Sequence, residues 1–150
     1  MDELLRRFRK QRVRYLLIGG QAVRLHGLAR FSMDWDFFIP AHDAKNLANI
    51  NAALADVVDE AVEPLGPRGQ NFVQTFQTPW GIAQFHLGAP GLPPFEEANR
   101  RALTLKTETG AMVRCLSGTD LLACKRAVNR PQDQLDIQFL AAKQKAGKLR

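Results

Sequence analysis

The chain has 150 residues, which is long enough for one domain with a hydrophobic core and excludes two domains of ordinary size. Hydrophobic residues make up 45% of the chain and charged residues 24%, a balance typical of a soluble globular protein. The formal net charge of +6 favours polyanionic partners such as nucleotides or RNA, although positive charge alone more often serves solubility.

The cysteines and the N-terminal segment indicate the cellular compartment in which the protein is expected. Cys115 and Cys124 have no companion ligands at zinc-like spacing, so we expect a reduced pair. The N-terminal segment lacks the apolar core and the cleavage site of a secretory signal. No apolar run approaches the roughly twenty residues of a membrane span. We therefore expect a cytoplasmic protein.

The first predicted element is a helix over residues 2–11, because Leu4, Leu5 and Phe8 recur at helical spacing. Its remaining face is basic and consists of Arg6, Arg7, Arg9 and Lys10. Such a face contacts RNA in some proteins and is more often simply solvated. A strand over residues 14–18 follows.

The segment from residue 16 to 40 is the most informative part of the chain. It predicts a strand, a break at Gly19 and Gly20, a short helix, a turn and a second apolar strand that ends at Pro40. Since side chains alternate between the two faces of a strand, Asp34 and Asp36 share one face. Two carboxylates are therefore expected in one small volume.

Two close carboxylates repel each other unless a cation lies between them. Magnesium suits this place because it prefers oxygen ligands and is usually held by one or two carboxylates together with substrate phosphates. Gly19 and Gly20 allow the backbone to approach a phosphate closely. Alone, a Gly-Gly pair is usually a turn and an Asp-x-Asp pair a solvated edge. The apolar setting of Asp34 and Asp36 argues against a solvated pair.

This stretch resembles the signature of the nucleotidyltransferase superfamily with the DNA-polymerase-beta-like fold. It is closest to the small bacterial branch that includes abortive-infection-type toxin nucleotidyltransferases, where a threonine usually stands in place of Ser32. The resemblance implies an α+β fold, with a mixed sheet flanked by helices, as a single minimal domain over residues 1–150. It also implies metal binding by Asp34 and Asp36 and nucleotide binding by Gly19, Gly20, Gln21, Arg30 and Ser32.

The middle of the chain predicts a helix over 43–54, with Leu47, Ile50 and Leu54 inside and Asn46, Asn49 and Asn51 outside, and then strands over 71–77 and 81–87. The second strand resembles the one that supplies a third catalytic carboxylate in the family. This chain has Gln84 or His86 there instead. A histidine can coordinate a divalent ion or take a proton, whereas a glutamine cannot act as a base. The alternative is a pair of polar residues on a half-exposed strand.

The last third predicts a turn or short helix over 95–101, a hairpin of strands 103–107 and 112–116, and a helix that Ser117 caps. The segment after Ser117 resembles the second motif of the branch, and the matching residues are Lys125, Arg130, Asp133 and Asp136. Lysine and arginine can bind a triphosphate. The alternative is a brace between helices in which Arg130 pairs with an aspartate. Residues 143–150 are expected to be a basic, frayed tail.

The resemblance implies transfer of a nucleoside monophosphate from a nucleoside triphosphate to an acceptor hydroxyl, with Mg²⁺ or Mn²⁺. The acceptor stays open among a protein, a transfer RNA and a small molecule, and the family setting suggests a toxin–antitoxin partner protein. The missing third carboxylate leaves a second hypothesis, a catalytically impaired module that binds a nucleotide or a partner. A third is an RNA-binding protein that uses the basic first helix and the tail.

Overall fold

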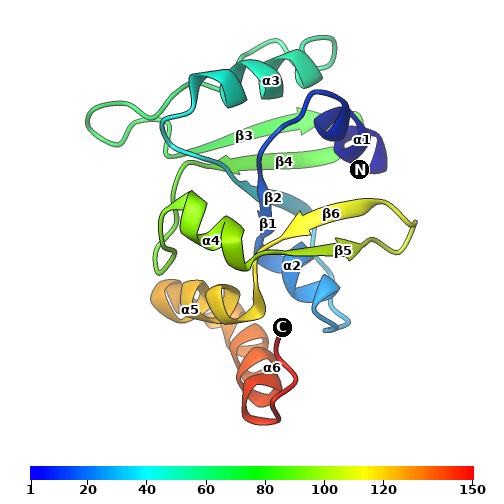
Figure 1. The fold of residues 1–150 in the computed structure, drawn as a ribbon, viewed down its shortest axis with the longest axis vertical. Helices are drawn as coiled ribbons and strands as arrows, with labels where there is room; N and C mark the ends of the chain where they lie inside the picture. Colours follow the sequence, from blue (N-terminus) through cyan, green and yellow to red (C-terminus); the bar gives the residue numbers. More distant parts are fainter.

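The computed structural model describes residues 1–150 as one mixed sheet with helices on both faces (Figure 1). The helices and strands are α1 (Asp2–Lys10), β1 (Leu16–Ile18), α2 (Gly19–Leu25), β2 (Asp34–Phe38), α3 (Ala44–Leu54), β3 (Val73–Thr78), β4 (Gly81–His86), α4 (Phe95–Arg101), β5 (Leu103–Lys106), β6 (Met112–Cys115), α5 (Gly118–Val128), η1 (Pro131–Asp133) and α6 (Gln134–Lys145). The predicted α+β class is therefore confirmed.

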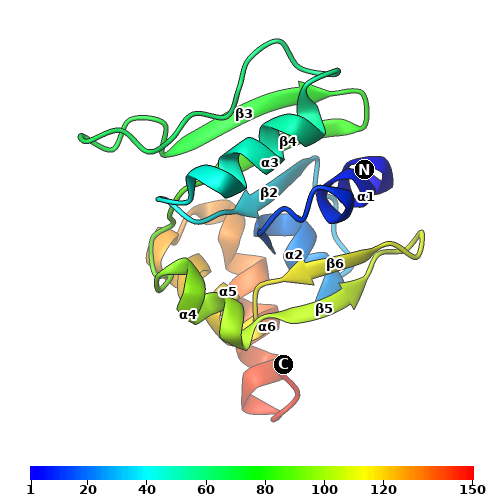
Figure 2. The same ribbon diagram turned by 45° about the horizontal axis from the view of Figure 1, so that its top comes forward.

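The sheet has six strands in the order β3-β4-β2-β1-β6-β5. The pairs β2–β4 and β1–β6 are parallel, and the other three pairs are antiparallel. Figure 2 shows α1 and α3 on one side of the sheet and α2, α5 and α6 on the other. None of the helices has both the length and the apolar character needed to cross a lipid bilayer.

Alternation along β2 separates the hydrophobic core from a polar face. Phe37 is fully buried and packs against Phe8 of α1 and Phe85 of β4, with ring centroids 5.2 and 5.7 Å apart. Such aromatic pairs add roughly 0.5–1.5 kcal/mol each beyond the area that they bury. Asp34 and Asp36 lie on the opposite face, toward α2. The core on one side thereby fixes which residues β2 presents on the other.

The basic face of α1 is less positive than its sequence suggests. Arg6 and Arg7 both form ion pairs with Glu3, and Arg7 also binds Asp56, with 2.5 Å between Nη1 and Oδ1. Arg7 further lies over the ring of Trp80 at 4.8 Å. These two arginines therefore have partners within the chain.

The prediction that Asn46 points outward is wrong. Its side chain is buried at the start of α3, where Oδ1 accepts a hydrogen bond from Arg14 N (2.7 Å) and Nδ2 donates one to Arg14 O (2.9 Å). Residues just before a strand need partners for their backbone groups when no neighbouring strand provides them. Asn46 supplies both partners, which helical periodicity alone does not reveal.

We expect Asn46→Ala to destabilise the fold by about 2 kcal/mol, because it leaves the N–H and C=O of Arg14 without their partners at a half-buried position. Urea denaturation followed by circular dichroism measures this change. Asn49→Ala is the matched control, because Asn49 is on the same helix and its side chain makes no hydrogen bond within the chain. Equal midpoints for the two variants would contradict the role of Asn46.

The prediction of a frayed C-terminal tail is also wrong. The helix α6 continues to Lys145, and Lys143 Nζ donates a hydrogen bond to His26 O (2.6 Å). Beyond the helix, Arg150 O accepts a hydrogen bond from Gly118 N at the start of α5, and Leu149 packs against Gly118. These contacts tie the segment back onto α2 and α5.

The burial of His26 leads us to expect that the stability of the fold depends on pH. Its ring is buried, and Nε2 lies 2.9 Å from Leu116 O. Burial lowers the pKa of His26, and the hydrogen bond to Leu116 only partly opposes this effect. Since the folded pKa lies below the unfolded value of about 6.5, the unfolded chain binds more protons as the pH falls.

We therefore expect stability to be full above about pH 6.5 and to be lost progressively as the pH falls below that value. Thermal unfolding between about pH 7 and 5 tests this, and His26→Gln, which does not titrate there, should flatten the profile. His42→Gln, at an exposed position, should leave the profile as in the wild type. A wild-type slope that survives in His26→Gln would refute the assignment.

Candidate active site

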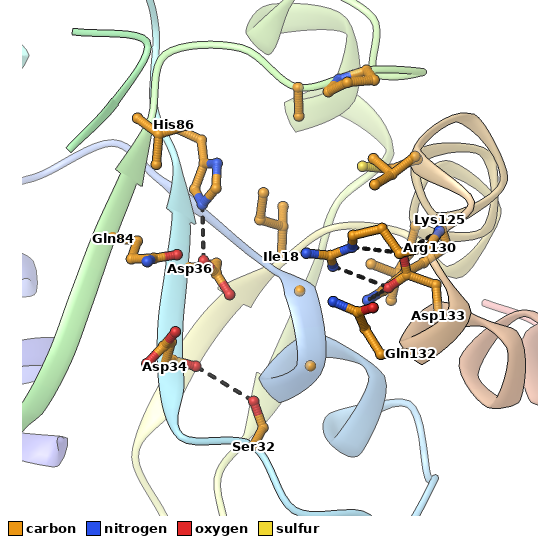
Figure 3. Close-up of a pocket in the computed structure, with 18 of the residues that line it drawn as sticks. Ile18, Ser32, Asp34, Asp36, Gln84, His86, Lys125, Arg130, Gln132 and Asp133 are labelled. Carbon is orange, nitrogen blue, oxygen red and sulfur yellow. Dashed lines mark hydrogen bonds and ion pairs between the residues drawn. The ribbon is translucent and has the colours of Figure 1, made fainter. Parts of the chain in front are cut away.

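A cavity of about 610 Å³ lies on the polar face of β2. Its volume is within the range of roughly 300–1,000 Å³ that is usual for small-molecule sites. Figure 3 shows its polar side chains in two groups, one on β2 and β4 and the other beyond the turn at Ile18. The first group is Asp34, Asp36, Gln84 and His86, and the second is Lys125, Arg130, Gln132 and Asp133.

Asp36 stands at the centre of the first group. Its Oδ1 lies 2.8 Å from His86 Nε2, and its Oδ2 lies beside Gly19. Gly19 has a φ of +70°, and a Cβ at this position would collide with Oδ2. Glycine is thus required both for the left-handed conformation and for the close approach. The acids and the glycine turn therefore face each other, as the sequence pattern predicts.

Asp34 and Ser32 line the same end of the cavity. Ser32 Oγ lies 3.5 Å from Asp34 O, at the limit of a hydrogen bond. It also lies against Gly20, where an added Cβ would collide with the hydroxyl. The hydroxyl at position 32 therefore sits between the glycine turn and the start of β2.

His86 rather than Gln84 contacts Asp36. Both residues lie on the same face of β4, and the parallel register sets Gln84 opposite Asp36 and His86 opposite Phe38. Gln84 turns to β3 instead, where its Nε2 donates to Thr75 Oγ1 at 3.2 Å. The sequence left these two positions open because alternation alone cannot decide between residues on one face. The hydrogen bond to Thr75 keeps the Gln84 amide on the β3 side and leaves the Asp36 carboxylate to His86.

The second group is built around Lys125, which is buried on α5. Its Nζ lies 2.9 Å from Asp133 Oδ1 and 3.0 Å from Asp136 Oδ2. Asp136 also accepts a hydrogen bond from Arg30 Nη1 at 2.7 Å. Burial raises the pKa of Asp133, but the hydrogen bonds from Arg130 and Lys125 outweigh burial and lower it well below its usual range. These ion pairs hold α5, α6 and the loop before β2 against one another.

Arg130 joins this brace and also reaches toward the cavity (Figure 3). Its Nε and Nη2 bind the two carboxylate oxygens of Asp133 at 2.9 and 3.1 Å. The hydrogen bond to Asp133 raises the pKa of Arg130, and the charge of Asp36 adds to this effect. Its side chain is 54% exposed, whereas that of Lys125 is 9% exposed. Nη1 of Arg130 has no partner within the chain and is available to an anion.

Some residues lie differently from the sequence prediction, and others were missed. Gln21 does not line the cavity; its amide binds Ser32 O (2.8 Å) and Arg24 Nη1 (3.1 Å) within the fold. Phe72 and Cys124 line the cavity, although no motif marks them. Burial raises the pKa of the Cys124 thiol, so this cysteine is not a thiolate at neutral pH.

The donor set fits a metal ion only in part. No group of three or more His, Cys, Asp or Glu side chains is arranged to hold a metal ion. Magnesium commonly takes one or two carboxylates and completes its shell with substrate phosphates and water. Asp34 and Asp36 line one cavity together with Gly19 and Gly20, so a triphosphate on the glycine turn would lie beside both carboxylates. The residues therefore fit a cation that is bound together with a triphosphate.

No protein-family model matches the chain, and no curated protein does. A crystal structure of a "putative nucleotidyltransferase" from Thermotoga maritima has a similar fold, with a TM-score of 0.58 at 11% sequence identity. The similarity covers 97% of this chain and 86% of the Thermotoga chain. The six-stranded mixed sheet and its helices therefore form a nucleotidyltransferase-like fold.

Proposed function

We propose that this chain is a metal-dependent nucleotidyltransferase that moves a nucleoside monophosphate from a nucleoside triphosphate to an acceptor hydroxyl. One observation carries the proposal. Asp34 and Asp36 lie on one face of β2 and share a cavity with the Gly19–Gly20 turn, and Asp36 Oδ2 is directly beside Gly19. The fold shared with the Thermotoga protein supports the same conclusion.

Some residues of the cavity would bind the metal ion and the phosphates, and others would hold these binding residues in position. Asp34 and Asp36 would hold Mg²⁺ or Mn²⁺, and the backbone of Gly19 and Gly20 would receive the phosphates. Arg130, through its unpaired Nη1, would bind a phosphate oxygen. A bound divalent ion would supply charge neutralisation for the triphosphate. Lys125 lines the cavity and holds Asp133 and Asp136 in place, and its third N–H group would bind the ligand.

His86 takes the role of a positioning residue. In its neutral form, the Nε2–H group donates a hydrogen bond to Asp36 Oδ1, which fixes the carboxylate and leaves Oδ2 facing the glycine turn. In the reaction, the acceptor oxygen bonds to the α-phosphorus, the bond from the α-phosphorus to the bridging oxygen breaks, and pyrophosphate leaves. In the overall balance the acceptor proton is released to the solvent, and Nε2 of His86 is not the atom that takes it, because Nε2–H already donates to Asp36 Oδ1.

Calorimetric titration with each ribonucleoside triphosphate in MgCl2, followed by a pyrophosphate-release assay, tests the proposal. We expect micromolar or tighter binding that requires the divalent ion, and release of pyrophosphate once an acceptor is present. A protein side chain, a transfer-RNA end and a small alcohol are the acceptors to compare, and the resemblance to toxin nucleotidyltransferases is a reason to try a partner protein first. No triphosphate binding with either Mg²⁺ or Mn²⁺ would refute the proposal.

One observation favours a second candidate, a module that binds a nucleotide or a partner without turnover. The chain has no third carboxylate beside Asp34 and Asp36, and the side chain that contacts Asp36 is a histidine, His86. Magnesium-dependent binding of a triphosphate without pyrophosphate release, across all three classes of acceptor, would establish this candidate instead.

A further inference from the structure

Apolar side chains gather around the cavity whose floor is charged. The chain has seven large hydrophobic residues with exposed side chains, and five of them line this cavity: Phe31, Met33, Phe72, Val73 and Val128. Exposed apolar side chains that cluster around a polar cavity often mark a place where a ligand is covered. The phosphates of a triphosphate would contact only the charged residues of the cavity. The apolar residues at its rim would therefore contact a different part of the ligand.

Phe72 is the one aromatic residue of this rim that the fold holds in place. Its carbonyl accepts a hydrogen bond from Leu87 N at 2.9 Å, and its ring lies on Gly88, where an added Cβ would be 2.9 Å from Cε2. The residue is nevertheless 41% exposed and lines the cavity. An aromatic ring that is supported on one side and open on the other is a stacking surface.

Phe72 also lies at the end of the cavity where the nucleoside is expected. The antiparallel register pairs its neighbour Val73 with His86, and His86 binds Asp36. Phe72 is therefore next to the site that would hold the metal and the α-phosphate, whereas Arg130 lies across the cavity (Figure 3). A triphosphate that runs from Asp36 toward Arg130 leaves its nucleoside on the Phe72 side.

We propose that Phe72, supported by Gly88, is the platform on which the base of the nucleoside triphosphate stacks. This inference rests on the proposed function. The residues beside Phe72 in the cavity wall, Val73, Gly88, Ala89 and Pro90, carry no polar side-chain atoms. Stacking tolerates any base because each has a π face, and purines offer the larger one. The platform therefore prefers purines over pyrimidines and separates adenine from guanine poorly.

The test measures the dissociation constants of ATP and of inorganic tripolyphosphate, both in MgCl2, by calorimetry. Phe72→Ala is expected to weaken ATP binding about tenfold, the usual loss when a stacking residue is removed. Tripolyphosphate, which has no base, should bind within about twofold of the wild type. Phe72→Trp should retain ATP binding, and Phe72→Leu, which keeps the packing on Gly88 without a π face, should lose most of it.

Two further variants separate stacking from general apolar contact. Gly88→Ala should weaken ATP binding to a similar extent, because its Cβ displaces the ring while Phe72 stays present. Phe31→Ala is the matched control, since Phe31 is on the same rim but is 81% exposed and unsupported, and it should change ATP binding less than about twofold.

Each outcome bears on one of the two proposals. Equal losses of ATP and tripolyphosphate in Phe72→Ala, or no loss of either, would overturn the platform while leaving the proposed function intact. The rim would then cover an apolar segment of the acceptor. If the wild type bound neither ATP nor tripolyphosphate, the proposed function and the platform would both fail. Purine and pyrimidine triphosphates of equal affinity would also count against the platform.

Discussion

Asp36→Asn is expected to reduce pyrophosphate release by about 10³-fold or more, because charge at the reacting phosphate is no longer balanced by a properly held cation. The variant keeps the shape of the side chain and removes one of the two carboxylates on this face of β2. It also alters the contact with His86, whose Nε2 lies 2.8 Å from Oδ1. Steady-state assays of kcat/KM for the triphosphate measure the loss.

Asp59→Asn is the matched control for this variant. Asp59 is exposed, forms no ion pair and lies outside the cavity, so the same change of charge should leave activity as in the wild type. Magnesium-dependent ATP binding provides an independent readout, and it should be lost in Asp36→Asn while the melting temperature changes little. Full activity in Asp36→Asn would show that the reaction does not use this face of β2.

Lys125→Met is expected to cost about 3–5 kcal/mol of stability, because it removes the cation from between two buried carboxylates. Asp133 and Asp136 are each 1% exposed, so water cannot take over the role of the ammonium group. For a chain of this length, the loss corresponds to a decrease in melting temperature of about 10 °C or more. Differential scanning calorimetry at pH 7 measures it.

The choice of pH follows from Asp133. Its pKa is lowered in the folded state, so its contribution is present above about pH 4 and is lost as the pH falls through the folded pKa. At pH 7 the full contribution is therefore measured.

Arg126→Met is the matched control for Lys125→Met, because Arg126 is on the same helix, exposed and without an ion pair. Adding Asp133→Asn and Asp136→Asn to Lys125→Met should recover part of the loss. A normal melting temperature in Lys125→Met would contradict the brace.

The local pattern of the chain predicts most of the elements and the face of β2 that carries the acids. A period of two along β2 is enough to place Asp34 and Asp36 together, because Phe37 must enter the core. The glycine turn is predicted in the same way, because only a glycine can adopt the positive φ of residue 19 so close to the carboxylate of Asp36. These features depend on residues that are near in sequence.

The features that the sequence leaves open depend on contacts between distant segments. Lys125 looks like a free cation for a triphosphate until α6 brings Asp133 and Asp136 to it. Asn46 looks solvated until the segment before β1 passes beside it. Gln84 and His86 share a face, and only the packing of β4 between β2 and β3 shows which of them reaches Asp36. Periodicity contains no information about these partners.

The position of β2 inside the sheet has a consequence for dynamics. Its backbone pairs with β4 along the whole strand and with β1 at residues 36–38, so the segment that carries Asp36 can open only when the sheet itself comes apart. Amide protons of Trp35 and Phe37 should accordingly exchange with solvent deuterium among the slowest in the molecule. The two acids are thus held on a rigid strand, and any conformational adjustment that accompanies ligand entry must occur in the segments around β2.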